Sequence, residues 1–171
     1  MNSIKNEVQF SKNSLTLENV ELSKGYKKLF SNFNLKFKHG KIYLVVGSNG
    51  IGKTTLLKCI CGLTIPDSGD IFWNNNSIKS NLKSFANDVY FLGHSNSLHP
   101  GLSIFENINY LSLLKNSRTQ FKNKNDEFGI LGLNDIRIPE LSNGQKRRVA
   151  LSILSNCEKP LWILDEPLNS V

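Results

Sequence analysis

Short apolar runs in the first half of the chain have the spacing of β-strands. Residues 15–20 predict one strand, and residues 33–38 alternate apolar and polar side chains, which predicts a strand with one buried face. The dipeptide His39-Gly40 then turns the chain into residues 42–46, an apolar run that predicts a further strand. This part of the chain therefore favours a β-rich unit.

Helical spacing follows in three places. Residues 54–61 form the first helical pattern, and residues 92–140 are mostly helical, with a polar loop at 115–125. A third apolar stripe begins after Leu141 and contains Val149, Ala150, Ile153 and Leu154. Between the first two patterns, residues 71–73 and Ile78 flank the turn signal of residues 74–77. Mixed strands and helices of this kind predict an α/β fold.

A phosphate-binding loop lies between the apolar run 42–46 and the first helix. It comprises Gly47, Ser48, Asn49, Gly50, Ile51, Gly52, Lys53, Thr54 and Thr55, which fit the pattern G-x-x-x-x-G-K-[ST]. Glycines bring backbone N–H groups close to phosphate oxygens, and a helix N-terminus adds about half a positive charge there. Lys53 supplies a cation for the β- and γ-phosphates, and the Thr54 hydroxyl can bind Mg²⁺.

Two carboxylates follow the last apolar run of the chain. Residues 161–164 are continuously apolar, which is typical of a parallel strand buried on both faces, and Asp165 and Glu166 come next. Ligands of α/β sheets bind at this end of the strands. We expect Asp165 to hold Mg²⁺ through water and Glu166 to polarise the attacking water.

The helix that begins near residue 143 has a capped N-terminus. Ser142 and Gln145 have the S-x-x-Q spacing of a capping box, and Gly144 leaves the backbone between them accessible. This helix start is a second candidate site for an anion. The basic residues Lys146, Arg147 and Arg148 are interpreted as a solvated face of the same helix.

Together these motifs resemble the ATP-binding subunits of ABC transporters. Residues 141–145, LSNGQ, are similar to the LSGGQ signature of that family, with Asn143 in place of the first glycine. Residues 66–71 resemble the turn that follows the phosphate-loop helix in these proteins. The resemblance extends from about Leu15 to the last residue. It implies a P-loop ABC-ATPase core with an antiparallel β flank and a helical subdomain at about 92–140.

One subfamily is more similar than the rest. Residues 90–94, Tyr-Phe-Leu-Gly-His, stand where most ABC ATPases have a glutamine loop, with His94 at the glutamine position. This pattern looks like the ATP-binding subunit of the haem exporter of cytochrome c maturation. Residues 29–31, 145–151 and 160–167 are also similar to that subunit.

The resemblance implies a mechanism and partners. Two subunits would enclose two ATP molecules, with Ser142 and Gly144 of one subunit facing the γ-phosphate held by Lys53 of the other. His94 would link Mg²⁺ and the attacking water to integral membrane subunits of the transporter. The chain would then be a peripheral ATPase on the cytoplasmic face of the inner membrane, or on the matrix face in an organelle. For adenine stacking, the family position falls on Lys24, and Tyr26 is the nearby aromatic candidate.

Composition narrows the class. The chain has 171 residues, 39% of them hydrophobic, which is a one-domain length with enough material for a core. We interpret residues 1–14 as a polar tail without the apolar centre of a signal peptide, which favours an intracellular protein. The three cysteines, Cys59, Cys61 and Cys157, lack metal-binding spacing and are interpreted as reduced packing residues. The net charge of +7 comes from scattered residues, and no nucleic-acid motif accompanies it.

The end of the chain leaves other interpretations open. In the resembling family an aspartate loop, another strand and a switch histidine follow the position of Val171. We therefore expect a C-terminally truncated domain with a gap in its central sheet. An inactive nucleotide-binding fragment is one alternative, and an ATPase of lipoprotein release or cell division is another. A nucleic-acid-associated ABC protein would need a second cassette.

Overall fold

The computed structural model describes residues 13–114, 127–130 and 132–168. Most of the predicted polar tail therefore lies outside the described residues, as does the predicted loop at 115–125. The chain divides into two compact units, Met1–Phe85 and Ala86–Val171. None of the helices in the described ranges is long and apolar enough to cross a membrane.

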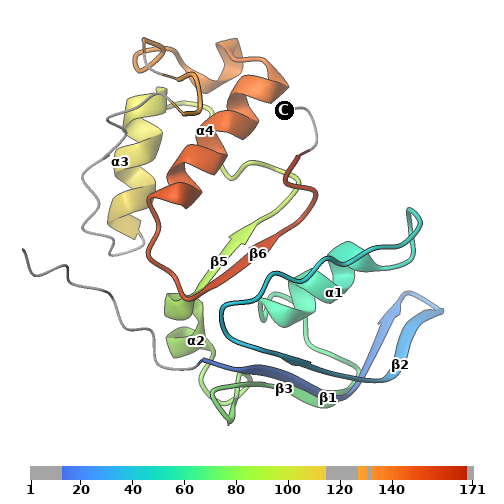
Figure 1. Ribbon diagram of the computed structural model, residues 1–171. Coiled ribbons are helices and arrows are strands. Elements are labelled where there is room, and N and C mark those ends of the chain that lie inside the picture. Colours follow the sequence, from blue (N-terminus) through green and yellow to red (C-terminus); the bar gives the residue numbers. More distant parts are fainter. Residues whose placement is uncertain (1–12, 115–126, 131, 169–171) are drawn as a thin grey trace, which may run out of the picture. The chain divides into compact units, whose positions relative to one another are not determined.

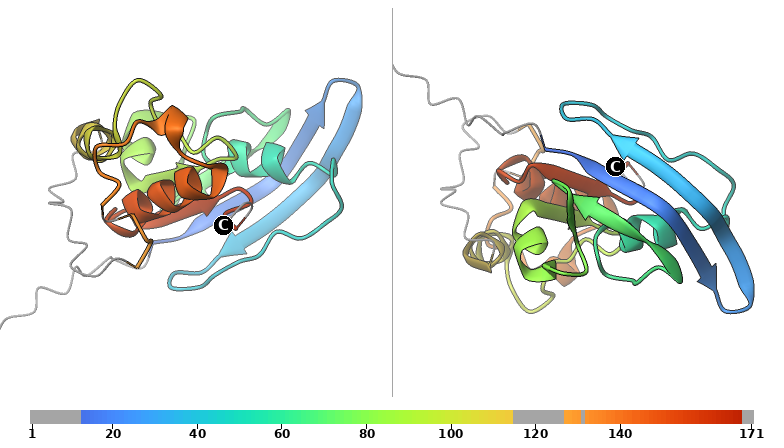
Figure 2. Two further views of the ribbon diagram at one scale, coloured as in Figure 1. Left: turned by 90° about the horizontal axis from the view of Figure 1, so that it is seen from above. Right: turned by 90° about the horizontal axis from the view of Figure 1, so that it is seen from below.

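The first unit contains a four-stranded antiparallel sheet in the order β2-β1-β3-β4. The long strands β1 (Leu15–Lys24) and β2 (Lys27–Phe37) form a hairpin, which Figure 2 shows as one curved blue ribbon. On the other side of β1 lie β3 (Ser68–Trp73) and the short β4 (Asn76–Ser77). The predicted strand at 15–20 is confirmed, and the turn predicted at 74–77 is confirmed at Asn74 and Asn75, while Asn76 and Ser77 form β4.

Local chemistry explains the turn between β3 and β4. Asn74 and Asn75 both have left-handed backbones, with φ of 52° and 63°. Asparagine tolerates this conformation because its short amide side chain can hydrogen-bond locally. The side chain of Asn76 donates to the carbonyl of Asn74 at 3.1 Å. The hairpin register is therefore set by turn residues that can be read directly from the sequence.

The helix α1 (Lys53–Ile60) follows the phosphate loop and contacts β1. Its buried side chains are Leu56, Cys59 and Ile60. The thiols of Cys59 and Cys61 are free and buried, and burial raises their pKa values to about 11 and about 12. The prediction that they are reduced packing residues agrees with this environment. A second helix, α2 (Leu82–Asp88), was not predicted, and its Phe85 ring packs against Trp73 with centroids 5.8 Å apart.

The second unit is built on two parallel strands, β5 (Val89–Leu92) and β6 (Leu161–Leu164). The helix α4 (Asn143–Ser155) lies beside these strands (Figure 1). An apolar cluster joins its Ala150 and Leu154 to Tyr90 and Leu92 of β5. Parallel pairing of the run 161–164 is confirmed.

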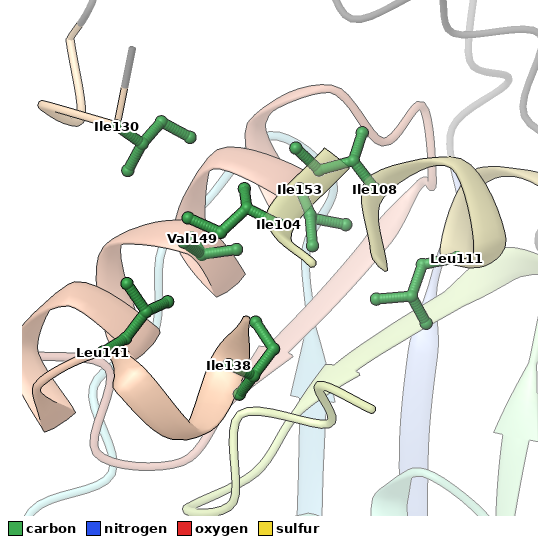
Figure 3. Packing of buried hydrophobic residues seen from close by; sticks show 8 residues of the cluster. All are labelled: Ile104, Ile108, Leu111, Ile130, Ile138, Leu141, Val149 and Ile153. Atoms are coloured by element: carbon green, nitrogen blue, oxygen red, sulfur yellow. The ribbon is translucent and has the colours of Figure 1, made fainter. Parts of the chain in front are cut away.

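A larger apolar cluster joins α4 to α3 (Ile104–Leu114) and to a short 3₁₀ helix, Ile138–Glu140. Figure 3 shows the side chains that meet there: Ile104, Ile108, Leu111, Ile130, Ile138, Leu141, Val149 and Ile153. The same cluster buries Leu141, the residue before Ser142. The start of α4 is therefore anchored by apolar packing directly beside its polar cap.

Three predictions about strands are wrong in detail. Residues 42–46 form no strand and are solvent-exposed, with Leu44 84% exposed, since no strand of the described ranges pairs with them. A strand needs a hydrogen-bonding neighbour, and an apolar run alone does not provide one. The strand β6 is not buried on both faces, because Trp162 is 46% exposed. The strand β2 has no fully buried face, since its most enclosed side chains are only half-buried.

Candidate functional site

The phosphate loop leads directly into α1. Gly52 is the N-cap residue and has a φ of 112°, and Gly50 has a φ of 78°. A β-carbon on Gly52 would lie only 2.9 Å from Cδ1 of Leu29 on β2. Glycine is therefore required at position 52 both by the backbone conformation and by the close approach of the hairpin. The N-terminus of α1 is left with backbone N–H groups that can bind an anion.

Lys53 closes the loop from inside the first turn of α1. Its Nζ donates to the carbonyls of Gly47 at 2.7 Å and Ser48 at 3.1 Å. The ammonium group therefore lies across the loop whose N–H groups are predicted to bind phosphate. A cation on a flexible stem at this place can follow phosphate oxygens while it remains anchored. Tyr26 is fully exposed in the turn between β1 and β2.

The two carboxylates lie at the end of β6, in the second unit. The backbone N–H of Asp165 donates to the carbonyl of Leu92 at 2.8 Å, which extends the pairing of β5 and β6 beyond the strands. Asp165 is only 4% exposed, whereas Glu166 is exposed and has a left-handed backbone with a φ of 49°. Left-handed conformations are unfavourable for residues other than glycine and persist where the surroundings enforce them.

His94 lies beside Glu166. Its Nδ1 is 3.8 Å from Oε2 of Glu166, and its side chain is 81% exposed. The loop after β5 and the loop after β6 therefore bring these two predicted site residues together. The distance is longer than a hydrogen bond, so the exposed imidazole would have to move slightly closer before the two groups could exchange a proton.

The start of α4 has the predicted capping box. The N–H of Gln145 donates to Oγ of Ser142 at 3.2 Å, and the N–H of Ser142 donates to Oε1 of Gln145 at 2.8 Å. Ser142 and Asn143 are exposed, and Gly144 is half-buried. This cap satisfies two backbone donors and holds the start of the helix at the surface. The prediction of a helix start at this position is confirmed.

The interpretation of residues 146–148 as a solvated face is wrong for Arg147. This side chain is 3% exposed, and its guanidinium donates to atoms of the loops after β5 and β6. Arg148 is partly buried and donates to the carbonyl of Phe128 at 3.2 Å. The available signal was helical spacing, because Arg147 lies three and seven residues before Ala150 and Leu154 of the buried stripe.

Comparison with known families decides the class of this protein. The family model described as "ABC transporter" matches residues 30–169. The chain belongs to this family. The predicted fold class and the predicted resemblance to ABC ATP-binding subunits are confirmed.

Individual relatives of this ABC transporter chain support the narrower resemblance. The "Cytochrome c biogenesis ATP-binding export protein CcmA" of Aliivibrio fischeri is 38% identical over 159 residues, which cover 92% of this chain and 78% of that protein. The CcmA of Albidiferax ferrireducens is 36% identical over 157 residues, with coverages of 90% and 75%. The predicted similarity to the ATPases of cytochrome c maturation is thereby confirmed.

A solved structure shows the same fold. A putative ABC transporter ATP-binding protein from Pyrococcus furiosus has a TM-score of 0.81 at 23% identity and covers 92% of this chain and 78% of that protein. The phosphate loop, the two carboxylates and the capped helix all lie within residues 30–169, which the family model matches. The chain is an ABC-type ATPase, and nucleotide is its substrate.

Thr54 and Asp165 are the two oxygen donors of this ABC-type chain that are predicted to hold a magnesium ion with the nucleotide. Mg²⁺ is bound by one or two protein oxygens and completes its shell with water and phosphate. The Thr54 hydroxyl follows Lys53 in α1, and the buried Asp165 carboxyl follows β6. In P-loop enzymes a hydroxyl and an aspartate in these two sequence positions hold the metal.

Proposed function

We propose that this chain hydrolyses ATP to drive haem export for cytochrome c maturation. The observation that carries the proposal is the glycine loop at the start of α1, with Lys53 held across it by the carbonyls of Gly47 and Ser48. The cargo follows from the CcmA relatives, which are described as export proteins of cytochrome c biogenesis. The His94 position, the predicted mark of that subfamily, supports the same assignment.

The residues divide the reaction between binding and chemistry. Backbone N–H groups of residues 47–55 and Lys53 bind the phosphates, and Thr54 and Asp165 would hold Mg²⁺, which would offset phosphate charge. Glu166 accepts a proton from the attacking water, and its exposed carboxylate is accessible for that role. His94, at 3.8 Å from Glu166, connects this carboxylate to the loop after β5.

The working unit in this proposal is a homodimer bound to integral membrane subunits. Ser142 and Gly144 of one subunit face the γ-phosphate that Lys53 of the other holds, and the exposed cap of α4 supports this role. A relative of the same fold, the ATP-binding cassette MJ0796, is described as dimeric with ADP and Pi bound, at a TM-score of 0.75 and 22% identity over 92% of this chain and 75% of that one. The subunit would bind peripherally on the cytoplasmic face of the inner membrane, or on the matrix face in an organelle.

Two substitutions test the ATPase part. Lys53→Ala should weaken ATP binding, because Lys53 contacts phosphate in the ground state. Glu166→Gln should retain ATP binding and lower turnover by on the order of 10²-fold, because it loses the proton acceptor. Nucleotide titration and phosphate release on the full gene product measure the two effects. Equal loss of nucleotide affinity in both variants would contradict the division of roles.

Complementation tests the cargo. The gene should restore covalent haem attachment to c-type cytochromes in a bacterium that lacks its own cytochrome c biogenesis ATPase, provided that the membrane subunits are co-expressed. Haem staining of periplasmic cytochromes is the measurement, and Glu166→Gln is the matched inactive control. An active ATPase that assembles with those subunits and yet leaves the cytochromes without haem would exclude this cargo.

A further inference from the structure

Arg147 connects three parts of the candidate site that are far apart in the sequence. It belongs to α4, five residues after Ser142, and its guanidinium reaches the loops that follow β5 and β6. We propose that Arg147 is a positioning residue for ATP hydrolysis, which fixes the backbone of Glu166 relative to the loop of His94. This inference rests on the proposed role of Glu166 as the proton acceptor.

Each of the five N–H donors of the Arg147 guanidinium can be matched to one acceptor atom. Nε donates to the carbonyl of Pro167 at 2.9 Å, and Nη2 donates to the carbonyls of Asp165 at 3.0 Å and Glu166 at 2.8 Å. Nη1 donates to the carbonyl of Gly93 and to Oδ1 of Asn96, both at 3.0 Å. A planar fork with five donors holds its partners in one geometry, which a single ammonium group cannot do.

These hydrogen bonds are made to a segment of backbone that has an unfavourable conformation. Glu166 has a left-handed φ of 49°. Arg147 donates hydrogen bonds to the carbonyl of Glu166 and to the carbonyls of the residues on either side, Asp165 and Pro167. Left-handed conformations of non-glycine residues persist only where the surroundings enforce them. Without Arg147, the turn after β6 would be free to relax, and the carboxylate of Glu166 would move with it.

The same side chain sets the distance between the two loops. Gly93 immediately precedes His94, so one guanidinium holds the peptides next to both His94 and Glu166. The side chains of His94 and Glu166 lie 3.8 Å apart on this shared support. Any movement of α4 is passed to both residues, because Arg147 is part of that helix.

A contribution to folding stability does not by itself explain why a buried arginine stands at position 147. Burial lowers the pKa of Arg147, while the nearby Asp165 and Glu166 charges oppose that shift. A buried ion pair can often be replaced by apolar residues of similar volume without loss of stability, so fixed geometry is a further contribution that a buried charge can make. The partners of Arg147 here are mostly backbone carbonyls of the loops that carry the site, which makes loop position its specific contribution.

The test uses Arg147→Met and Arg147→Lys in the full gene product, with Arg148→Met as the matched control on the same helix. The Arg148 side chain donates to the carbonyl of Phe128, away from the loops after β5 and β6, and is not part of the site. For both Arg147 variants we expect kcat to fall by about tenfold or more, with the dissociation constant for ATP changed by less than about threefold. Arg148→Met should leave both quantities near the wild-type values.

A double-mutant cycle separates positioning from general damage. In the Glu166→Gln background, Arg147→Met should cause little further loss of kcat, because the group that Arg147 positions is already disabled. Fully additive losses would overturn the proposal, as would unchanged kcat in both Arg147 variants. Loss of cooperative unfolding and of ATP binding in both variants would show a purely structural role and would also overturn it.

The failure of this inference can be distinguished from failure of the proposed function. If Glu166→Gln abolishes turnover and the Arg147 variants do not reduce it, only the positioning role is wrong. If Glu166→Gln itself retains full turnover, the assignment of Glu166 is wrong and the positioning role falls with it.

Discussion

At the residue scale, the phosphate loop offers a matched pair of glycines. Gly50 and Gly52 both have positive φ, at 78° and 112°. A β-carbon added to Gly52 would lie 2.9 Å from Cδ1 of Leu29, whereas one added to Gly50 would have nothing within 4 Å. Gly50→Ala should therefore cost about 1 kcal/mol of unfolding free energy from strain alone. Gly52→Ala should cost more, by on the order of 1–3 kcal/mol, because strain and overlap add.

Denaturant unfolding of the two variants measures this difference, and ATP titration measures its effect on the loop. A methyl group at position 50 needs no movement of other parts of the chain, because nothing lies within 4 Å of it. Equal destabilisation by both substitutions would mean that the hairpin does not approach Gly52 as closely as the structure shows.

At the element scale, the capping box of α4 makes a separable contribution. Ser142→Ala removes the acceptor for the N–H of Gln145 and should lower the unfolding free energy by about 1 kcal/mol. Ser155→Ala is the control, because the Ser155 hydroxyl only donates back to the carbonyl of Ser152 within the same helix. Its effect should be no more than a few tenths of a kcal/mol.

Thermal and denaturant unfolding of both serine variants compare the two ends of α4. A larger loss for Ser155→Ala than for Ser142→Ala would show that the cap does not limit the stability of this helix. The ATP affinity of isolated subunits should be unchanged in both, since the phosphates are assigned to residues 47–55.

At the scale of the whole molecule, two buried thiols and a buried tyrosine hydroxyl predict that stability is lost at alkaline pH. Burial raises the pKa of Cys59 from 9.0 to about 11, of Cys61 from 9.0 to about 12, and of Tyr90 from 10.0 to about 12. A folded-state pKa above the unfolded value means that the contribution is fully present below about pH 9 and is lost as the pH rises toward 12.

The unfolding free energy should therefore fall steadily between pH 9 and pH 11, within reach of denaturant titration. The variant Cys59→Ala with Cys61→Ala should show a shallower fall, because two of the three groups no longer titrate. The native thiols should also react slowly with thiol reagents at pH 8, since the thiolate is the reactive form. Rapid labelling of Cys59 and Cys61 in the native state would contradict their burial.

The proposed dimer makes a prediction about mixed subunits. Ser142→Ala and Lys53→Ala each damage both composite sites of a homodimer. A mixed dimer of the two variants has one intact site and one site with both defects. If one site suffices for turnover, mixing should restore ATPase activity above that of either variant alone, with mass spectrometry as the check on mixing. Activity equal to the separate variants, in a sample shown to contain mixed dimers, would argue against an interface through the start of α4.

The sequence by itself determined the features that depend on neighbours along the chain. The phosphate loop, the capping box at Ser142 and Gln145, the asparagine turn after β3 and the first long strand were all predictable. Each arises from hydrogen bonds or backbone preferences within a few residues, so the local sequence contains all the partners. The family resemblance could also be recognised from the sequence, because the motifs of the family are short and occur in a fixed order.

Only the tertiary structure decided which of these segments find partners at long range. The run 42–46 is as apolar as β6, yet β6 pairs with β5 and residues 42–46 form no strand. Arg147 looked like one of three solvated basic residues, but the fold places it among carbonyls 18 to 54 positions away in the sequence. Strand pairing and burial depend on groups that come together only when the chain folds. The local sequence pattern does not show which distant residues will become neighbours.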